Sequence, residues 1–351
     1  MVNKFEKKII WISDFPLRGS SFGTVTYELL TRMPEYKFEV LSLGYSGVPL
    51  KIGENIRIFQ LEKDYQIRYY FKRFDPDVTV VFHSFWLLDS MKNELVHLKG
   101  KRILYIPCEG EEIPYQYRNL FTQFDQVITP SEYSRRVLKK AGINASVVPH
   151  GVDLKFFTPK EKPWHEFRFG YLGMNDIRKQ VPRIMEAYAR LKQGILTLAT
   201  ENEGHYDLMQ LAKRLGISPV FIEQKLYGLP MSRESVRDYL RSLDVYISPG
   251  SEAFGLPALE AQACGVPVIA SEHGASREVL GNGAVYVKVN EYLETSVGKV
   301  GLVSVADLYR KMRFLIQVRQ AWEKTREKAL KNAQKWSWER AVERMREEIE
   351  K

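Results

Sequence analysis

Short apolar, β-branched runs alternate with amphipathic stretches along most of the chain. This alternation is typical of strand–helix–strand units, because a strand buried in a parallel sheet reads as a continuous apolar run and its crossover helix shows a 3.6-residue period. The pattern therefore predicts an α/β protein. In the first half of the chain it predicts strands at 8–13, 38–43, 56–61, 78–83, 102–107, 126–129 and 145–148.

A second series of the same kind follows residue 153. It predicts strands at 167–172, 195–199, 220–224, 245–248, 266–270 and 284–287, separated by helical stretches. Between the two series, residues 150–163 contain two prolines and a glycine and have a broken period, which indicates a linker. Two doubly wound domains, 1–150 and 151–335, fit this pattern. From residue 304 onward we expect long helices with a break at 336–338.

Composition narrows the class of protein. A chain of 351 residues that is 44% hydrophobic and 27% charged is expected to fold around sizeable cores and is not of the disordered or collagen-like class. Its two cysteines, Cys108 and Cys264, belong to no CxxC or Cys/His cluster, so neither a disulfide framework nor a structural zinc site is expected. The apolar stretch at 9–13 is too short for a signal sequence or a membrane span, and we expect a soluble, cytoplasmic protein.

The net charge of +9 favours acidic partners such as phosphate-bearing donors. Basic residues are interleaved with acidic ones rather than gathered into arms, which argues against a nucleic-acid partner. Metal binding is not expected at Asp75-Pro-Asp77, because Asp-Pro before an apolar strand indicates a helix stop and a turn.

The segment 244–271 carries the most chemical information. It predicts strand, loop, helix and strand, with Pro257 at the first helical position. The amides around Phe254, Gly255 and Leu256 would then point outward from a positive helix end, at the sheet edge where doubly wound proteins bind phosphates. This arrangement predicts an anion site.

Two carboxylates, Glu252 and Glu260, would flank a phosphate held by these amides. Carboxylates beside a phosphate are suited to accepting hydrogen bonds from sugar hydroxyls rather than to binding the charge. Spacing alone leaves a second interpretation open, because glutamates near a helix N-terminus are stabilised by the helix dipole without any ligand.

The full string from Glu252 through the Phe-Gly-Leu-Pro turn and Glu260 to Ser271 resembles the E-x7-E signature of retaining glycosyltransferases of the GT-B fold, specifically glycosyltransferase family 4. Five further segments resemble family elements in the family's order: a glycine-rich loop at 19–30, an interdomain hinge at 148–153, a donor-phosphate segment at 170–179, a base-binding segment at 226–231, and the start of the last helix at 336–339. Segments 22–26 and 44–49 also resemble a prokaryotic, often archaeal, mannosyltransferase-like subgroup.

The resemblance implies two Rossmann-like domains facing each other across a cleft. Residues 1–150 with a crossing helix at 336–351 would bind the acceptor, and residues 151–335 would bind the donor. The implied reaction moves a hexosyl group from a UDP- or GDP-type nucleotide-diphosphate sugar to a saccharide, lipid-linked or other hydroxyl acceptor, without a metal or other cofactor.

The resemblance also implies a role for each matching residue. Glu260 would accept hydrogen bonds from the ribose hydroxyls of the nucleotide, and Glu252 would contact hydroxyls of the donor sugar. The backbone amides of Phe254, Gly255 and Leu256 would hold the distal phosphate.

Cations and glycines complete the implied donor site. Arg178 and Lys179 would neutralise the diphosphate as it leaves, although spacing alone also fits a solvated basic pair. Gly23, in the loop after the first strand, would let the backbone approach the diphosphate, although such a loop is a turn as often as a phosphate cradle. Tyr227 or Leu229 would pack on the base, and an ordinary connection is the alternative there.

The acceptor side departs from the commonest family pattern. Many members have a histidine after the fifth N-terminal strand, where this chain places Glu109. We expect Glu109 to replace that histidine in orienting the acceptor hydroxyl or stabilising positive charge on the sugar. His83 would face the same site, or else be a satisfied, partly buried imidazole. A nucleophilic role for Cys108 is not expected, because no histidine neighbours it in sequence.

Aromatic and basic residues around Tyr69 would allow peripheral contact with the inner membrane face and a lipid-linked acceptor, or would form the packed face of a helix. Three other functions stay open: a phosphorylase of the same fold, a sugar-nucleotide epimerase, and a non-catalytic module that binds a nucleotide sugar or nucleic acid. An NAD-dependent enzyme is not expected, because the GxGxxG sequence is missing after the first strand.

Overall fold

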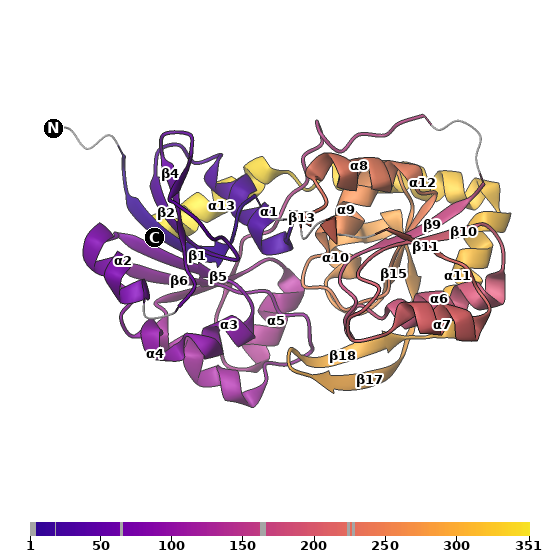
Figure 1. Cartoon of the computed structure of the whole chain (residues 1–351), viewed down its shortest axis with the longest axis horizontal. Coiled ribbons are helices and arrows are strands. Elements are labelled where there is room, and N and C mark those ends of the chain that lie inside the picture. The colour runs from indigo at the N-terminus through magenta and orange to yellow at the C-terminus, as the bar shows by residue number, and fades with distance from the viewer. Residues whose placement is uncertain (1–4, 18, 64–65, 162–165, 223–224, 227–228) are drawn as a thin grey trace. The chain divides into compact units, whose positions relative to one another are not determined.

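The computed structural model describes residues 5–17, 19–63, 66–161, 166–222, 225–226 and 229–351 (Figure 1). The chain forms two compact units. The N-terminal unit comprises Met1–Gly151, Ser296–Gly298 and Trp338–Lys351, and the C-terminal unit comprises Val152–Thr295 and Lys299–Ser337.

The N-terminal unit is built on an eight-stranded sheet of order β3-β4-β2-β1-β5-β6-β7-β8. All neighbouring strands run parallel except β3 and β4, which are antiparallel. Its strands are β1 Lys8–Asp14, β2 Lys37–Leu43, β3 Leu50–Ile52, β4 Ile56–Gln60, β5 Val78–Phe82, β6 Lys101–Tyr105, β7 Gln126–Thr129 and β8 Ser146–Val147. Its helices are α1 Ser21–Leu30, α2 Gln66–Phe74, α3 Phe85–Ser90, α4 Lys92–Leu95, α5 Glu132–Lys140, α13 Trp338–Glu350 and the 3-10 helix η1 Tyr115–Gln123.

The C-terminal unit contains a six-stranded parallel sheet of order β11-β10-β9-β14-β15-β16 and two hairpins, β12–β13 and β17–β18. Its strands are β9 Arg168–Leu172, β10 Ile195–Ala199, β11 Val220–Ile222, β12 Lys225–Leu226, β13 Leu229–Pro230, β14 Val245–Ser248, β15 Val268–Ser271, β16 Ala284–Val287, β17 Val289–Thr295 and β18 Gly298–Val303. Its helices are α6 Val181–Leu191, α7 Leu208–Leu215, α8 Arg233–Ser242, α9 Leu256–Ala263, α10 Ser276–Leu280, α11 Val305–Gln317, α12 Arg319–Ala333 and the 3-10 helix η2 Gly281–Gly283.

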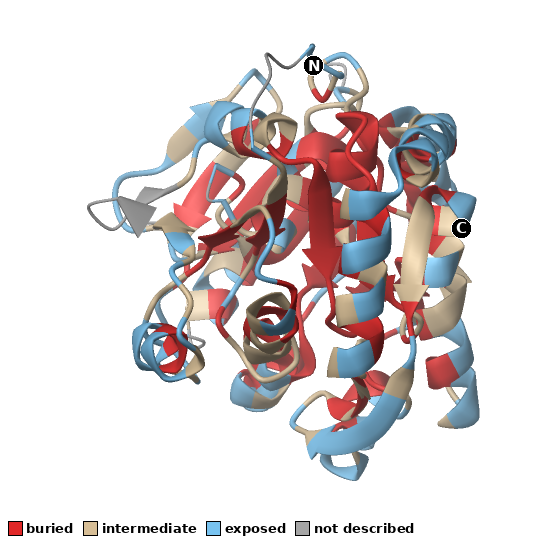
Figure 2. Cartoon of the chain, turned by 90° about the vertical axis from the view of Figure 1, so that its right-hand side faces the viewer, coloured by how far each residue is buried: buried red, intermediate tan, exposed pale blue. Residues whose placement is uncertain are grey.

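Burial explains why these segments are strands and helices. The central strands β14 and β15 are buried at every position, as a parallel sheet covered on both faces requires. The amphipathic helices cover the sheet, and Figure 2 shows buried strands behind helices whose outward faces are exposed. Each unit thus buries its own apolar core.

The predicted α/β class is confirmed, and every predicted strand overlaps an observed one. The predicted break before the last helix is also observed, between Ala333 and Trp338. The short strand β3 and the hairpins β12–β13 and β17–β18 were missed. The physical reason is that β17 is exposed along most of its length, so it lacks the apolar run that marked the other strands.

The last helix, α13, belongs to the N-terminal unit and packs against its first segments. Lys7 Nζ lies 2.6 Å from a carboxylate oxygen of Glu350, and Arg346 Nε donates to Glu35 Oε1 at 2.6 Å. Trp338 at its start is buried. These contacts tie a helix that is more than 300 residues distant in sequence to the strand and helix ends of the first unit.

A buried histidine in the N-terminal unit predicts a pH dependence of stability. His150 packs near the rings of Tyr105, Phe82 and Trp338, and burial lowers the pKa of its imidazole to about 3. In the unfolded chain the same group takes up a proton near pH 6.5, so the folded state loses stability as the pH falls through that value. Between pH 7.5 and 5.0 this linkage amounts to about 2 kcal/mol.

We therefore expect urea unfolding of the wild-type protein to lose about 2 kcal/mol more over that pH interval than unfolding of a His150→Gln variant does. All other titrating groups are shared by the two proteins, so their contributions cancel. Equal pH dependence in both proteins would contradict the prediction.

Candidate active site

The segment between β14 and α9 has the predicted form. Gly255 caps the helix with a φ of +91°, a left-handed conformation that favours glycine. Leu256 opens the helix and Pro257 follows it, one position later than predicted. Because the first amides of a helix lack partners within it, this end is a positive pole suited to an anion. Phe254, just before the cap, is buried, and its ring lies against Trp336 at 5.3 Å.

The structure brings Glu252 together with Arg178 and Lys179, as the sequence predicted for one site. Lys179 Nζ lies 2.6 Å from Glu252 Oε1, and Arg178 Nη1 lies 3.5 Å from Glu252 Oε2. Arg178 Nη1 also donates to the carbonyl of Ser251 at 2.9 Å. All three charged side chains are less than one-fifth exposed. A cationic pair is thus fixed on a carboxylate just before a helix N-terminus.

Glu252 is held in its ionised form. Burial by itself raises the pKa of this carboxyl, but the charges and hydrogen bonds of Lys179 and Arg178 outweigh that effect, and the net pKa lies below its ordinary value. An ionised carboxylate can only accept hydrogen bonds. Glu252 is therefore an acceptor for Lys179, Arg178 and any hydroxyl group that enters the site.

The loop with Arg178 and Lys179 and the loop with Glu252 meet because their backbones approach each other closely at Gly250. A Cβ atom on Gly250 would lie 2.9 Å from the carbonyl oxygen of Arg178 and 3.2 Å from the Cα of Lys179. Asp176 Oδ1 accepts a hydrogen bond from the backbone N–H of Lys179 at 2.8 Å and shapes the turn. Gly250, two residues before Glu252, thus makes room for the segment that carries Arg178 and Lys179.

A third loop supports Glu252 from the other side, and sequence reasoning missed it. The backbone N–H of Ala275 donates to the carbonyl of Glu252 at 2.8 Å. A Cβ on Gly274, whose φ is +80°, would come within 2.8 Å of the Glu252 backbone. His273 Nδ1 lies 2.8 Å from Ser251 Oγ. The only sequence signal was a glycine shortly after the strand that ends at Ser271.

Glu260 is almost fully buried in α9, and Arg233 Nη1 donates to its Oε1 at 2.7 Å. The guanidinium of Arg233 lies 4.8 Å from the centre of the Phe157 ring. Arg233 was not among the predicted site residues, because nothing in its own sequence context marks it. Glu260 of α9 and Arg233, the first residue of α8, thus form a second charged pair.

Two of the predicted donor-binding residues fall on or beside positions that the structure does not describe. Tyr227 lies outside the residues that the structure describes. The backbone of Leu229 pairs with Leu226 in the β12–β13 hairpin, and its side chain is not described. Their packing on a base stays a prediction.

The placement of Gly23 in a loop was wrong. Gly23 is the third residue of α1, and its backbone N–H donates to Ser20 Oγ at 3.0 Å. The physical reason is that Ser20 acts as a helix N-cap, which starts the helix earlier than the glycine-rich composition suggested.

His83 follows β5 and is 3% exposed. The backbone N–H of Ser84 lies 2.9 Å from its Nδ1, and its Nε2 lies 3.1 Å from Asp14 Oδ1, which ties the ends of β5 and β1 together. The ring also stacks on Phe22 at 4.3 Å. His83 was predicted either to face the acceptor site or to be a buried imidazole with its hydrogen bonds made within the protein. The structure favours the second interpretation.

Glu109 lies partly buried in the segment after β6, the strand next to β5 in the sheet. The neighbouring Cys108 is 1% exposed, and burial raises the pKa of its thiol well above the ordinary value. Such a thiol is a poor nucleophile. Between these two neighbours, Glu109 is the better candidate for contact with a substrate.

Both carboxylates of the Asp75-Pro-Asp77 segment contact neighbouring protein groups. Asp77 Oδ2 accepts a hydrogen bond from the backbone N–H of Lys8 at 2.7 Å, and Asp75 lies 3.5 Å from Lys99. Within the described residues, no three His, Cys, Asp or Glu side chains are grouped so as to hold a metal ion.

Helix α2, which carries the aromatic and basic residues around Tyr69, has one face packed in the core and one exposed face. Ile67 and Phe71 are buried in the core, whereas Tyr69 is 58% exposed beside Lys72 and Arg73. No helix among the residues that the structure describes has the length and apolar character needed to cross a membrane. Surface contact through Tyr69 and its cationic neighbours stays a prediction.

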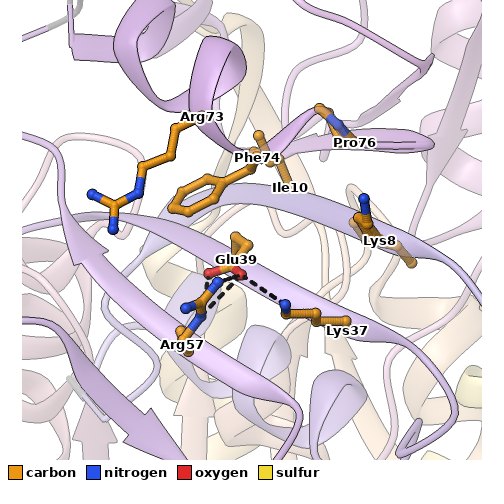
Figure 3. Close-up of a pocket in the computed structure, with 9 residues that line it drawn as sticks. Lys8, Ile10, Lys37, Glu39, Arg57, Arg73, Phe74 and Pro76 are labelled. Carbon is orange, nitrogen blue, oxygen red and sulfur yellow. Dashed lines mark hydrogen bonds and ion pairs between the residues drawn. The ribbon is translucent and has the colours of Figure 1, made fainter. Parts of the chain in front are cut away.

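A cavity of about 190 Å³ lies in the N-terminal unit, at the edge of the sheet where its parallel strands begin (Figure 3). Lys8 and Lys37, the first residues of β1 and β2, line it together with Glu39 and Arg57. Arg57 forms a bidentate ion pair with the buried Glu39. The cavity is at the amino ends of the strands and is thus separate from the carboxyl edge that carries His83 and Glu109.

The family model described as "Glycosyl transferases group 1" matches residues 155–336, and the chain belongs to this family. This range contains Arg178, Lys179, Glu252 and Glu260. The fold is GT-B, with two Rossmann-like parallel sheets and a long C-terminal helix.

Two curated relatives illustrate the similarity. The chain is 32% identical over 166 residues to a D-inositol 3-phosphate glycosyltransferase of Geodermatophilus obscurus, which covers 41% of this chain and 36% of the relative. It is 31% identical over 177 residues to a GDP-mannose-dependent alpha-(1-6)-phosphatidylinositol dimannoside mannosyltransferase of Mycobacterium tuberculosis, covering 45% of this chain and 43% of the relative. The chain thus spans less than half the length of these relatives.

Solved structures show the same fold over nearly the whole chain. Sucrose-phosphate synthase from Thermosynechococcus elongatus has a TM-score of 0.78 at 16% identity, covering 97% of this chain and 98% of that one. Anabaena Alr3699/HepE in complex with UDP and glucose has a TM-score of 0.75 at 14% identity, covering 98% and 100%. At such low identity these similarities establish the fold alone.

Proposed function

We propose that this chain is a retaining, metal-independent glycosyltransferase that moves a hexosyl group from a nucleotide-diphosphate sugar to a hydroxyl group of a saccharide or lipid-linked acceptor. One observation carries the proposal: Lys179 and Arg178 converge on an ionised Glu252 just before the N-terminus of α9. This arrangement combines cations and a helix end for a diphosphate with a carboxylate for sugar hydroxyls.

The chemistry of the transfer explains why both parts are needed. When the bond between the sugar and the diphosphate breaks, negative charge accumulates on the departing phosphate oxygens. Fixed cations and backbone amides stabilise that charge without reorganising during the reaction. Glu252, which accepts only, would hold hydroxyls of the donor sugar while Lys179 and Arg178 face the diphosphate.

Support for the donor class comes from the relatives. The Mycobacterium tuberculosis relative is named for its dependence on GDP-mannose, and the Anabaena structure contains UDP and glucose. We infer a UDP- or GDP-linked hexose as the donor, bound by the C-terminal unit, with the ribose hydroxyls at Glu260. The N-terminal unit would bind the acceptor, with Glu109 in contact with its reacting hydroxyl.

Calorimetric titration with UDP, GDP and ADP and their hexose conjugates tests this proposal. We expect one base to bind at least about tenfold more tightly than the others, because each 1.4 kcal/mol of base contacts changes Kd tenfold. The same Kd is expected in EDTA and in magnesium. Binding of none of these nucleotides would contradict the proposal, and transfer with inversion of the anomeric centre would contradict the retaining mechanism.

The same titration tests the ribose contact. Glu260→Gln keeps the shape of the side chain but replaces a charged acceptor by a neutral one, so nucleotide affinity should fall about tenfold. Glu323→Gln is the matched control, because Glu323 is an exposed residue of α12 that pairs with Arg319. Equal affinity in wild type and Glu260→Gln would remove Glu260 from the nucleotide site.

A further inference from the structure

Gln180 directly follows the cationic pair and has a backbone conformation that is unusual for its side chain. Its φ is +57°, in the left-handed region, where it caps the N-terminus of α6. A residue with a Cβ is strained in this region relative to glycine, because the Cβ approaches the backbone closely. The side chain is 3% exposed. A buried polar side chain at a strained position needs compensating contacts.

The amide of Gln180 supplies such contacts in three directions. Its Nε2 donates to the carbonyl of Pro249 at 3.1 Å and to the carbonyl of Gly301 at 2.9 Å. Its Oε1 accepts a hydrogen bond from the backbone N–H of Val303 at 2.8 Å. One side chain thus joins the start of α6, the segment before Glu252 and the strand β18.

The position of these contacts connects them to the candidate chemistry. Pro249 lies three residues before Glu252, and Gln180 lies one residue after Lys179. The ion pair between Lys179 and Glu252 is therefore flanked by a buried hydrogen bond between the two segments that carry it. Strand β18 provides a third anchor, and Arg183 holds it to α6 by donating to the carbonyl of Val303 at 2.8 Å.

We propose that Gln180 is a positioning residue that fixes Lys179 relative to Glu252, with the base of the β17–β18 hairpin as the anchor. The inference rests on the proposed transferase function. An apolar side chain in the same place would leave the Pro249 and Gly301 carbonyls and the Val303 N–H without this partner in a buried site. A glycine would relieve the backbone strain but remove the buried hydrogen bonds by which Gln180 joins the segment of Lys179 to that of Glu252 and to β18.

The test compares Gln180→Gly with Lys192→Gly. Lys192 caps the other end of the same helix with a φ of +50°, and its side chain is exposed. Both variants remove left-handed strain from a residue with a Cβ, but only Gln180→Gly removes buried hydrogen bonds. We expect kcat to fall at least about tenfold in Gln180→Gly, with the donor KM within about threefold of wild type, because misplaced charges weaken transition-state stabilisation. Lys192→Gly should keep the wild-type kcat.

Hydrogen exchange separates this inference from the proposed function. In Gln180→Gly, the backbone amides of residues 250–253 and of Val303 should exchange faster than in wild type and in Lys192→Gly, whether or not the protein transfers sugar. Gln180→Asn, which tolerates a positive φ but is one methylene shorter, should show the same change if the glycine variant does not fold. Unchanged exchange in that segment, or a kcat loss no larger than in Lys192→Gly, would overturn the role of Gln180. If the wild-type protein transfers no sugar but Gln180→Gly still shows the predicted faster exchange, only the proposed function is overturned.

Discussion

A Lys179→Ala variant is expected to transfer its sugar at least about a hundredfold more slowly than the wild type, since removal of one preorganised charge or donor from a leaving-group site typically costs 10² to 10³ in kcat. The Lys179 side chain is 18% exposed and its Nζ lies 2.6 Å from Glu252 Oε1, so its position is fixed before any ligand binds. In such a partly buried site, the charge acts at short range with little screening by water. Steady-state kinetics with a saturating donor would measure the loss.

The control for Lys179→Ala is Arg190→Ala, which removes an exposed cation from α6, the helix that follows the segment with Lys179. It should leave kcat unchanged. We expect only a small change in melting temperature for Lys179→Ala, because Arg178 still lies 3.5 Å from Glu252 and compensates its charge. A folded Lys179→Ala protein with wild-type kcat would show that Lys179 serves the ion pair and not the reaction.

The convergence of Lys179 and Glu252 could be predicted because it follows from sheet topology. The segments that carry them come after β9 and β14, and these strands are neighbours in the parallel sheet. Loops after adjacent parallel strands meet at the same carboxyl edge. A motif that fixes one loop therefore indicates where the other must lie.

The supporting contacts could not be predicted in the same way. Gln180 binds partners at Pro249 and Gly301, which are 69 and 121 residues away in sequence. Its left-handed backbone has no local signature, since glutamine has no preference for that region. Gly274 supports Glu252 through a close approach that is visible only once both loops are placed.

The hairpin β17–β18 shows why exposed elements escape prediction. Its first strand buries little apolar surface, and its sequence has neither a continuous apolar run nor a strict alternation. The hairpin depends on contacts at its base, where a Cβ on Gly301 would come within 3.0 Å of the His273 ring. Such packing depends on residues from another loop, so the sequence of the hairpin alone does not reveal it.

Glu252→Gln is expected to change binding and turnover in opposite directions. The amide keeps the size of the carboxylate and one acceptor oxygen but loses the negative charge. Lys179 and Arg178 are then no longer neutralised by a neighbour, and the repulsion between Glu252 and a bound diphosphate disappears. A nucleoside diphosphate should therefore bind several-fold more tightly.

Turnover of the same variant should fall about tenfold to a hundredfold, because a charge-assisted hydrogen bond to a sugar hydroxyl is worth about 1.5–3 kcal/mol. Titration calorimetry with the nucleoside diphosphate and steady-state kinetics with the donor sugar measure the two effects on one protein preparation. Glu252→Asp is the matched variant: it keeps the charge but shortens the reach to Lys179, so it should lose turnover without the gain in nucleotide affinity.

The low pKa of Glu252 extends the prediction to pH. Because Lys179 and Arg178 keep the carboxyl ionised below its ordinary pKa of 4.5, the stability that their ion pairs contribute is present above that pH and is lost as the pH falls through the lower folded value. Above pH 4.5 Glu252 stays ionised in the wild-type protein, so its protonation should not raise nucleotide affinity there. Glu252→Gln should show its higher affinity at every pH. Weaker nucleotide binding by Glu252→Gln, or unchanged turnover, would mean that Glu252 serves to shape the loop and does not contact the donor sugar.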